Sequence, residues 1–157
     1  MLRRQAARGA LAPQSTFRIT RTFCQDDTES FGALTRDYNP VHYEQRWVAH
    51  KGMRAPICHG LLVGSMLCEV GGQLGWLASG MSFRFRRPVY FGDTVTCELT
   101  IRSIDARFCA TADCVLTNQQ GEVVVTAMLE GYLPDRDEQA LLQAMMDEGD
   151  PTNGARR

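Results

Sequence analysis

The chain has 157 residues, 44% of them hydrophobic, which fits one domain of ordinary size with a single buried core. Seventeen basic and eighteen acidic residues leave a net charge of -1, so no global positive field favours a nucleic acid as the partner. No apolar run approaches the length that crosses a membrane, and the six cysteines and three histidines lack the spacing of a zinc site. We therefore expect a soluble protein with neither a metal nor another cofactor.

The first segment, residues 1–15, carries Arg3, Arg4 and Arg8 among alanines and holds no acidic residue. This composition is typical of a mitochondrial transit peptide, which predicts a protein of the mitochondrial matrix. A disordered basic tail is the alternative. A secretory signal is disfavoured because no uninterrupted apolar stretch follows the arginines.

The folded domain is expected to begin with a strand and to extend over residues 16–134. Residues 16–23 are predicted to form that strand. Asp26 or Asp27 is well placed to cap a helix that runs to about Thr35. A strand and a helix therefore lead into the domain.

A rigid turn is predicted over residues 37–42, because Pro40 denies Asn39 helical geometry and fixes its own φ. A second short helix is expected over residues 41–48, and an irregular loop over residues 51–56. The rigid turn thus separates two helices near the start of the domain.

The stretch from residue 60 to residue 77 has apolar or small residues on nearly every helical face, so we expect a helix that the fold encloses. Its glycines cost about 1 kcal/mol each relative to alanine, which favours close packing against a sheet as the compensation. Cys68 lies in this stretch, and Cys97 and Cys114 lie at inward-facing strand positions. We expect these three thiols to be buried and reduced, which is typical of a reducing compartment.

Four strand-like runs follow the helix, at residues 81–90, 94–104, 107–116 and 122–132, with turn-forming residues between them. Apolar and polar residues alternate in the second run, which indicates one buried and one solvated face. A helix before a long-stranded antiparallel sheet predicts an α+β architecture, the hotdog fold, in which the sheet curls around a central helix.

The last segment, residues 135–157, follows the sheet. A short helix fits residues 138–146, and the rest is rich in Gly, Asp, Pro and Asn. We expect a carboxyl-terminal tail that is partly disordered.

Two motifs carry the chemistry. Residues 37–42 have the sequence Asp-Tyr-Asn-Pro-Val-His, and residues 59–62 have the sequence His-Gly-Leu-Leu, with Ser65 one turn later. Together they resemble the signature of the MaoC-like (R)-specific enoyl hydratases, and within that family the chain is similar to the mitochondrial 3-hydroxyacyl-thioester dehydratases of type 2. The likeness covers residues 18–133. One departure is Arg36, where the family usually has glycine.

The resemblance implies reversible dehydration of a (3R)-3-hydroxyacyl thioester to the trans-2-enoyl thioester. This reaction removes a weakly acidic α-proton, places charge on the thioester oxygen and protonates the departing hydroxyl. The resemblance assigns Asp37 and His42 as the catalytic pair; which of them moves which proton stays open, because two such groups titrate as a coupled unit. It also implies that Asn39 orients the pair, that the N–H of Gly60 receives the thioester oxygen, and that Ser65 contributes a hydrogen bond.

Each of these residues also has a plainer interpretation when it is taken singly. Asp37 alone is a turn or helix cap, His42 is an exposed turn histidine, and Ser65 is a small residue that suits helix packing. For His59 we favour a structural role as a cap of the helix that follows it. His50 belongs to no motif and is predicted to face solvent. The ordered combination of Asp, Asn, Pro and His before a His-Gly helix start favours catalysis.

Arg84, Arg86 and the adjacent Arg87 form a basic stripe after the helix, while Phe83 and Phe85 point to the opposite face of the strand. The stripe can contact the phosphate of a phosphopantetheine arm or an acidic carrier protein; a solvated sheet face is the alternative. The substrate is accordingly expected on acyl carrier protein or coenzyme A, in mitochondrial fatty acid synthesis. By analogy with other hotdog domains we expect a homodimer, because pairing covers an exposed edge strand.

Two other functions fit the same fold. An acyl-thioesterase directs water at the carbonyl carbon, but hotdog thioesterases commonly use a helix-borne carboxylate and not the Asp-x-Asn-Pro-x-His turn. A non-catalytic subunit that binds acyl carrier protein would not need an intact Asp37 and His42. The sequence favours the dehydratase and leaves the acyl chain length open.

Overall fold

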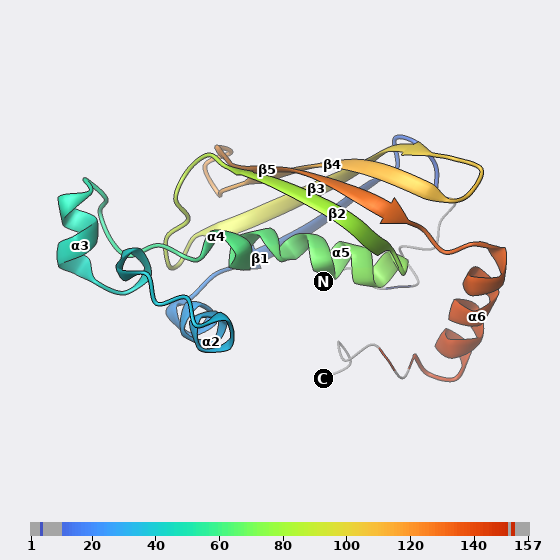
Figure 1. The fold of residues 1–157 in the computed structure, drawn as a ribbon, viewed down its shortest axis with the longest axis horizontal. Coiled ribbons are helices and arrows are strands. Elements are labelled where there is room, and N and C mark those ends of the chain that lie inside the picture. The colour runs from blue at the N-terminus through green and yellow to red at the C-terminus, as the bar shows by residue number, and fades with distance from the viewer. Residues whose placement is uncertain (1–3, 5–10, 151, 153–157) are drawn as a thin grey trace.

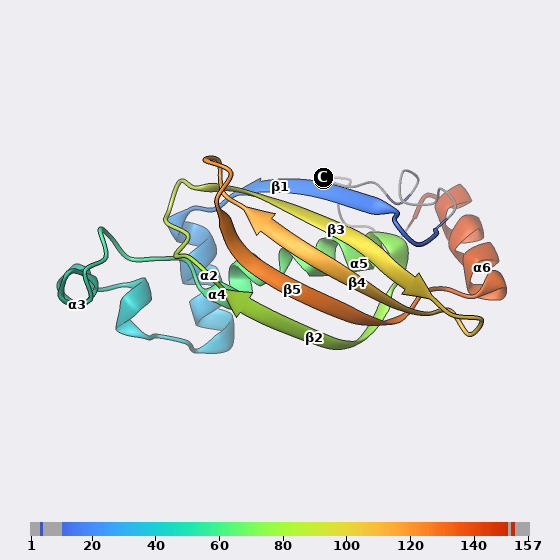
Figure 2. The ribbon, with the colours of Figure 1, turned by 90° about the horizontal axis from the view of Figure 1, so that it is seen from above.

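The computed structural model describes Arg4, residues 11–150 and Thr152. Over these residues a five-stranded antiparallel sheet packs against one side of a two-part helix (Figure 1). The strands follow the order β1-β3-β4-β5-β2, so β1 and β2 form the two edges (Figure 2). The sheet is open and curls over the helix, which is the α+β hotdog arrangement that the sequence predicts.

The strands are β1 (Thr16–Thr22), β2 (Leu77–Phe85), β3 (Thr94–Ile104), β4 (Cys109–Thr117) and β5 (Val123–Tyr132). All except β2 lie close to their predicted positions. β2 begins and ends earlier than the predicted run at residues 81–90. Pro88 has no N–H to donate to a neighbouring strand, so it does not continue the predicted strand, and β2 ends at Phe85.

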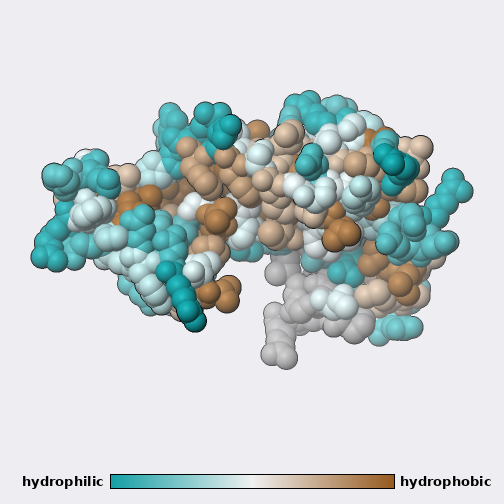
Figure 3. Space-filling view, viewed as in Figure 1, coloured by the Kyte–Doolittle hydropathy of each residue, from teal (hydrophilic) through white to brown (hydrophobic). Residues whose placement is uncertain are grey.

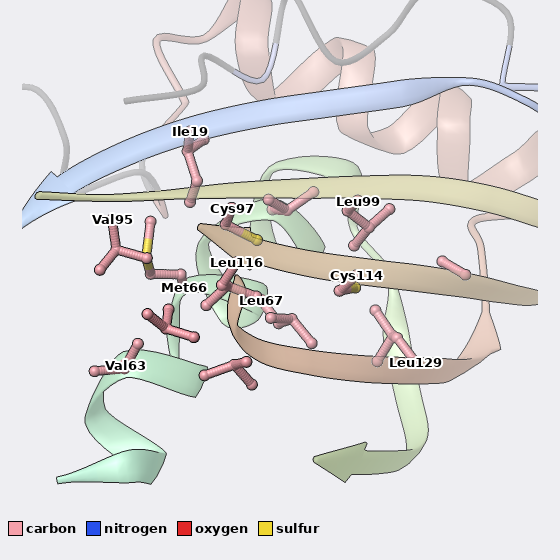
Figure 4. Close-up of a cluster of buried hydrophobic side chains, with 14 of the residues drawn as sticks. Ile19, Val63, Met66, Leu67, Val95, Cys97, Leu99, Cys114, Leu116 and Leu129 are labelled. Carbon is pink, nitrogen blue, oxygen red and sulfur yellow. The ribbon is translucent and has the colours of Figure 1, made fainter. Parts of the chain in front are cut away.

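The sheet has one apolar and one polar face. Inward-facing residues of β3 and β4 are buried in pairs, as predicted for this alternation: Cys97 with Leu116, Leu99 with Cys114, and Ile101 with Ala112. Figure 4 shows several of these side chains in the core between the sheet and the helix. On the outer face, threonine hydroxyls of β1 and β3 hydrogen-bond across the strands, at Thr16 and Thr100, Thr20 and Thr96, and Thr22 and Thr94.

The central helix is divided into α4 (Gly60–Gly64) and α5 (Met66–Leu74), which meet at Ser65. The sequence predicts one helix over residues 60–77. The helix instead ends at Gly75, whose φ of 69° is the left-handed conformation that favours glycine at a helix end. The residues beyond Gly75 are therefore free to start β2.

Two glycines of α4 allow the sheet to approach closely. A Cβ atom at Gly60 would lie 2.8 Å from the ring of Phe85, and one at Gly64 would lie 2.8 Å from the ring of Phe83. The predicted compensation for the helical glycines, close packing on the sheet, is confirmed.

One side of the central helix faces solvent. Met66 and Val70 are buried against the sheet, whereas Leu61 and Cys68 are exposed. The expected full enclosure of the helix and the expected burial of Cys68 are wrong, because an open sheet covers only one side of the helix. None of the described helices has the length and apolar character of a membrane span.

Three short helices gather at one end of the sheet, beside α4 (Figures 1 and 2). They are α2 (Gln25–Thr35), η1 (Pro40–His42) and α3 (Gln45–His50). The N–H of Cys24 donates to the carboxylate of Asp27 (2.8 Å), which caps the start of α2. The single helix predicted over residues 41–48 is thus two shorter ones, η1 and α3.

The chain joins the fold before the predicted domain boundary. The N–H of Gln14 donates to the carbonyl of Ile101 (2.8 Å), and the N–H of Ile101 donates to the carbonyl of Ser15 (2.9 Å). Leu11 packs against the core. Apart from Arg4, the residues of the predicted transit peptide that precede Leu11 lie outside the described residues.

The chain after the sheet forms α6 (Arg136–Asp147), so the short helix predicted over residues 138–146 is confirmed and is slightly longer. The carboxylate of Asp135 accepts from the N–H of Glu138, and the carboxylate of Glu138 accepts from the N–H of Asp135. Beyond α6, Asp150 forms an ion pair with Arg4 (3.1 Å). The final residues of the predicted disordered tail lie outside the described part of the chain.

Candidate active site

The predicted turn lies between the end of α2 and the first residues of α4. α2 ends at Arg36, whose φ of 60° is left-handed and whose N–H donates to the carbonyl of Gly32 (2.7 Å). Glycine is favoured at such a helix end, because it has no Cβ to clash in the left-handed conformation. Arg36 adopts the same conformation at a cost of about 1 kcal/mol. The departure therefore leaves the path of the turn intact.

The carboxylate of Asp37 faces two histidines. Its Oδ1 accepts a hydrogen bond from the N–H of Asn39 (3.2 Å), which holds the carboxylate across the turn. Its Oδ2 lies 3.9 Å from Nε2 of His42 and 3.9 Å from Nε2 of His59. Both separations exceed the length of a hydrogen bond, so the carboxylate faces the imidazoles without bonding to them directly.

The ring of His42 is buried and is held from behind. Its Nδ1 lies 2.8 Å from the carbonyl oxygen of Ile57, which requires a proton on Nδ1. Burial lowers the pKa of His42 and the imidazole of His59 lowers it further, although the hydrogen bond to Ile57 and the carboxylate of Asp37 act in the opposite direction. The ring is therefore neutral at neutral pH, and its Nε2 presents a lone pair toward Asp37. The exposed turn histidine of the plainer interpretation is wrong.

A third side chain, that of His59, belongs to the same cluster. His59 is 1% exposed, and its ring stacks on that of His42 with the centroids 3.8 Å apart and the planes at 29°. Its Nε2 donates to the carbonyl oxygen of Asp37 (2.9 Å). His59 stands at the N-cap position of α4, yet its side chain makes no capping hydrogen bond. The predicted capping role is wrong, because the side chain points back to the turn.

Asp37, His42 and His59 also bring ligand atoms within 4.8 Å of one another, and they form the one such group of potential metal donors in the described part of the chain. The Nε2 atom of His59 is already engaged with a carbonyl oxygen. That hydrogen bond leaves Oδ2 of Asp37 and Nε2 of His42 facing each other.

The two predicted supporting side chains are directed elsewhere. The side-chain oxygen of Asn39 accepts from the N–H of Val41 (3.3 Å) and so caps η1, while the backbone N–H of Asn39 holds Asp37. Ser65 donates to the carbonyl of Leu62 (2.6 Å) at the junction of α4 and α5. The structure brings Asn39 to the site through its backbone, and it leaves Ser65 outside the cavity wall.

The cluster opens into a cavity of about 620 Å³. Its polar wall contains Asp37, His42, His59 and Gly60. As the first residue of α4, Gly60 has an N–H without a partner inside the helix. Cys58 also lines the cavity, and burial raises the pKa of its thiol to about 11, which keeps the thiol protonated. The apolar wall consists of Phe31, Met53, Ile57, Leu61, Val63, Phe85, Pro88, Val89 and Val125.

The predicted arginine stripe is divided. Arg86 and Arg87 line the cavity, whereas Arg84 lies on the outer face of β2, opposite the side chain of Phe85. Arg87 pairs with Glu122 (3.3 Å). Two of the three arginines of the predicted stripe therefore contribute to the cavity wall.

A sheet curled over a helix, with a carboxylate and a neutral imidazole facing each other where that helix begins, defines a hotdog domain equipped for acid–base chemistry. A family model described as a MaoC like domain matches residues 9–124. The chain belongs to the MaoC-like domain family.

Similar proteins have names that agree with this family. The chain is 30% identical over 122 residues to the (R)-specific enoyl-CoA hydratase of Aeromonas caviae, which covers 74% of this chain and 91% of that protein. It is 26% identical over 125 residues to the mitochondrial 3-hydroxyacyl-[acyl-carrier-protein] dehydratase FERN of Solanum lycopersicum, which covers 76% of each chain. These names denote hydro-lyases, and we assign the chain to that enzyme class.

Solved structures agree with the fold. The (R)-hydratase from A. caviae superposes with a TM-score of 0.74 at 30% identity, over 80% of this chain and 98% of that one. The R-hydratase PhaJ1 from Pseudomonas aeruginosa superposes with a TM-score of 0.74 at 26% identity, over 80% of this chain and 84% of that one.

Proposed function

We propose that the protein catalyses the reversible dehydration of (3R)-3-hydroxyacyl thioesters to trans-2-enoyl thioesters, with Asp37 and His42 in the chemical step. The observation that carries this proposal is the 3.9 Å separation between Oδ2 of Asp37 and Nε2 of His42, in the wall of a largely apolar cavity. A carboxylate oxygen and a neutral Nε2 are both acceptors. A water molecule whose oxygen lies about 2.8 Å from each can donate one proton to each.

The pair then moves protons in both directions of the reaction. In hydration, the oxygen of the held water attacks C3 of the enoyl thioester, one of its protons passes to the pair, and a proton from the pair ends on the α-carbon. In dehydration, the pair takes the α-proton, the C3–O bond breaks, and the hydroxyl leaves as water with a proton from the pair. The two groups act as one coupled unit in each step.

The N–H of Gly60 is the proposed donor to the thioester oxygen, on which negative charge develops. Gly60 lines the cavity and directly follows His59, so this donor and the acid–base pair face the same space. With the oxygen held there, the pair can deliver water to only one face of C3. This geometry supports a single stereochemical outcome, and the relative named as an (R)-specific enoyl-CoA hydratase supports the 3R alcohol.

The cavity wall supports a thioester with an acyl chain and a phosphate-bearing arm. The apolar side chains suit the acyl chain, and Arg86 and Arg87 suit the phosphate of a pantetheine arm. Acyl carrier protein and coenzyme A both present this arm. Two relatives are named as mitochondrial acyl-carrier-protein dehydratases, which supports acyl carrier protein as the physiological thiol and mitochondrial fatty acid synthesis as the pathway.

The proposed location is the mitochondrial matrix, supported by those names and by the acid-free leader over residues 1–15. Because Leu11 packs on the core and Gln14 pairs with Ile101, removal of a transit peptide before Leu11 would leave the fold intact. A fusion of residues 1–30 to a fluorescent protein is expected to enter mitochondria. A cytosolic fusion would contradict the proposed location.

The proposed assembly is a homodimer. β2 is an edge strand on which Leu77, Met81 and Phe85 are exposed, and Figure 3 shows hydrophobic residues along the middle of this side of the molecule. An exposed apolar edge is a template for pairing with a second copy. Sedimentation equilibrium is expected to give about twice the chain mass of 17.5 kDa; a monomer would contradict the proposal.

Direct observation of the reaction tests the function. Purified protein mixed with a crotonyl thioester is expected to consume the enoyl absorbance and to form the 3R alcohol on chiral analysis. Predominant 3S product would refute the assignment. Release of free thiol would indicate an acyl-thioesterase, and the absence of both products would indicate a binding subunit.

A further inference from the structure

His59 is the most buried polar residue of the cluster, although the proposed reaction gives it no proton to carry. Its side chain donates to the carbonyl of Asp37 (2.9 Å), and its ring stacks on His42 at 3.8 Å. The ring of Phe31, from α2, also packs on it at 5.2 Å. Its backbone directly precedes Gly60 at the start of α4. His59 therefore contacts both the turn that carries Asp37 and the ring of His42, and its own backbone forms the start of α4.

We propose that His59 is a positioning residue that sets the separation between the carboxylate of Asp37 and the imidazole of His42. The inference deepens the proposed function and rests on it. Asp37 and His59 are 22 residues apart in the chain, and the hydrogen bond between them ties the turn to the start of α4. The hydroxyl of Tyr43 reaches the same carbonyl at 3.4 Å, so it is the weaker second donor.

The chemistry of the His59 ring favours this role over simple filling of the core. The other ring nitrogen, Nδ1, is buried and has no hydrogen-bond partner among the described residues. An unpaired buried nitrogen disfavours the folded state, so a phenyl ring would fill the same space with a smaller penalty. The imidazole is explained by the bond that its Nε2 makes to Asp37.

The stacked ring also affects the protonation of His42. Burial lowers the pKa of His42 and the imidazole of His59 lowers it further, whereas the hydrogen bond to Ile57 and the carboxylate of Asp37 raise it. The titratable groups that contact His59 are Asp37, His42 and the ring of Tyr43, whose centroid lies 5.9 Å away. His59 therefore helps to keep His42 neutral and able to accept a proton.

Two substitutions separate the hydrogen bond from the ring. His59→Gln keeps an N–H donor near the position of Nε2, while His59→Leu fills the space and removes the donor. We expect His59→Leu to lower kcat about 100-fold with KM little changed, because the substrate still binds while the pair is misplaced. His59→Gln should recover most of that loss, which a merely structural role for the ring would not predict.

A second measurement does not depend on turnover. NMR titration of the His42 ring should show a higher pKa in His59→Gln than in the wild-type protein, because the neighbouring imidazole that lowers it is gone. The acid limb of kcat in this variant should move to higher pH in parallel, since His42 must be neutral to accept a proton.

His50→Gln and Thr28→Val serve as matched controls. His50 is an exposed histidine at the end of α3, away from the cavity. Thr28 has a buried hydroxyl that interacts with the thiol of Cys58, and Thr28 itself lies outside the cavity wall. Both variants should retain the wild-type kcat and leave the titration of His42 unchanged.

The outcomes separate this inference from the proposed function. It is overturned if the wild-type enzyme is active and His59→Leu, folded by circular dichroism, matches its kcat. It is also overturned if His59→Gln fails to recover the rate and His42 titrates in it as in the wild-type protein. If His59→Leu does not fold, the inference is tested with His59→Gln alone, through its kcat and the pKa of His42 in that variant. If the wild-type protein has no turnover, the proposed function fails, and the titration still decides whether His59 acts on His42.

Discussion

The middle of the sheet and the site at its end differ in how they accommodate polar groups. Between β3 and β4 the buried side chains are apolar groups or thiols, and the hydroxyls lie on the outer face, where threonines pair across β1 and β3. At the site, two imidazoles are buried beside a half-exposed carboxylate. The Nδ1 atom of His59 has no hydrogen-bond partner among the described residues.

This difference assigns stability and chemistry to separate residues. The apolar face of the sheet supplies most of the free energy of folding, because burial of apolar area is its main favourable term. The site contains polar groups whose burial disfavours folding. The same burial shifts their pKa values, which suits them to acid–base chemistry. Substitutions at the site should therefore change the rate more than the stability, and substitutions in the sheet should do the reverse.

The largest effect is expected from Asp37→Asn, which keeps the shape of the side chain and removes the proton acceptor. Loss of one acid–base partner commonly lowers the rate by about two to four powers of ten. The unfolding temperature should shift little, since the Asp37 side chain is half exposed. Turnover and thermal unfolding are measured together, with Asp26→Asn as the control at another exposed aspartate. Near-normal turnover by folded Asp37→Asn protein would sink the proposed mechanism.

The opposite result is expected from Leu99→Ala in β3. Leu99 is 0% exposed, and truncation of such a side chain lowers the free energy of unfolding by about 2–5 kcal/mol. Leu34→Ala is the matched control, because Leu34 is 82% exposed and the same truncation there should be nearly neutral. Urea unfolding measures both. A loss of kcat per folded molecule in Leu99→Ala, without a loss of stability, would break the comparison.

The lowered pKa of His42 predicts how activity and stability depend on pH. kcat should fall as the pH drops through the folded-state pKa, which lies below the ordinary value of 6.5. The unfolded chain binds this proton more tightly than the folded one. The contribution of His42 to stability is therefore present above about pH 6.5 and is lost as the pH falls toward the folded-state pKa.

This pH prediction is checked with a kcat profile and urea unfolding at matched pH. His42→Asn should flatten the corresponding part of the stability profile, because it removes the titrating group. If kcat instead begins to fall above pH 6.5, the ordinary pKa of histidine, the surroundings of His42 do not keep its ring neutral. The buried imidazole would then titrate like a histidine on the surface, which would contradict the contrast between the site and the sheet.

The smallest effect is expected from charge reversal of the arginines. Arg86→Glu should slow carrier-linked turnover by about tenfold at low salt, with less effect on coenzyme A substrates, and the loss should fade as salt screens the attraction. Arg84→Glu should have a smaller effect, because Arg84 lies on the outer face of β2. Equal losses on both kinds of substrate would contradict contact with the carrier protein.

The sheet and the turn are largely predictable because they depend on neighbouring residues. Cys97, Leu99 and Ile101 alternate with polar residues, and in a strand this period of two places them on one face whatever lies above it. Pro40 likewise stiffens the turn through its own ring. Helix ends are harder. The break at Ser65 lies inside a stretch of apolar and small residues that gives no local signal of a helix end.

The sequence by itself determines the hotdog fold, the turn that carries Asp37 and His42, and the helix start at Gly60. The place of His59 directly before Gly60 indicates that it lies near the site. Only the tertiary structure decides that its side chain turns away from the helix and contacts Asp37, 22 residues earlier. The structure alone also decides that Cys68 is exposed and that Arg84 is separated from Arg86. These outcomes depend on which side of the helix an open sheet covers, and on where the chain leaves that sheet. Both are set by contacts between segments that are distant in the chain, which no local pattern contains.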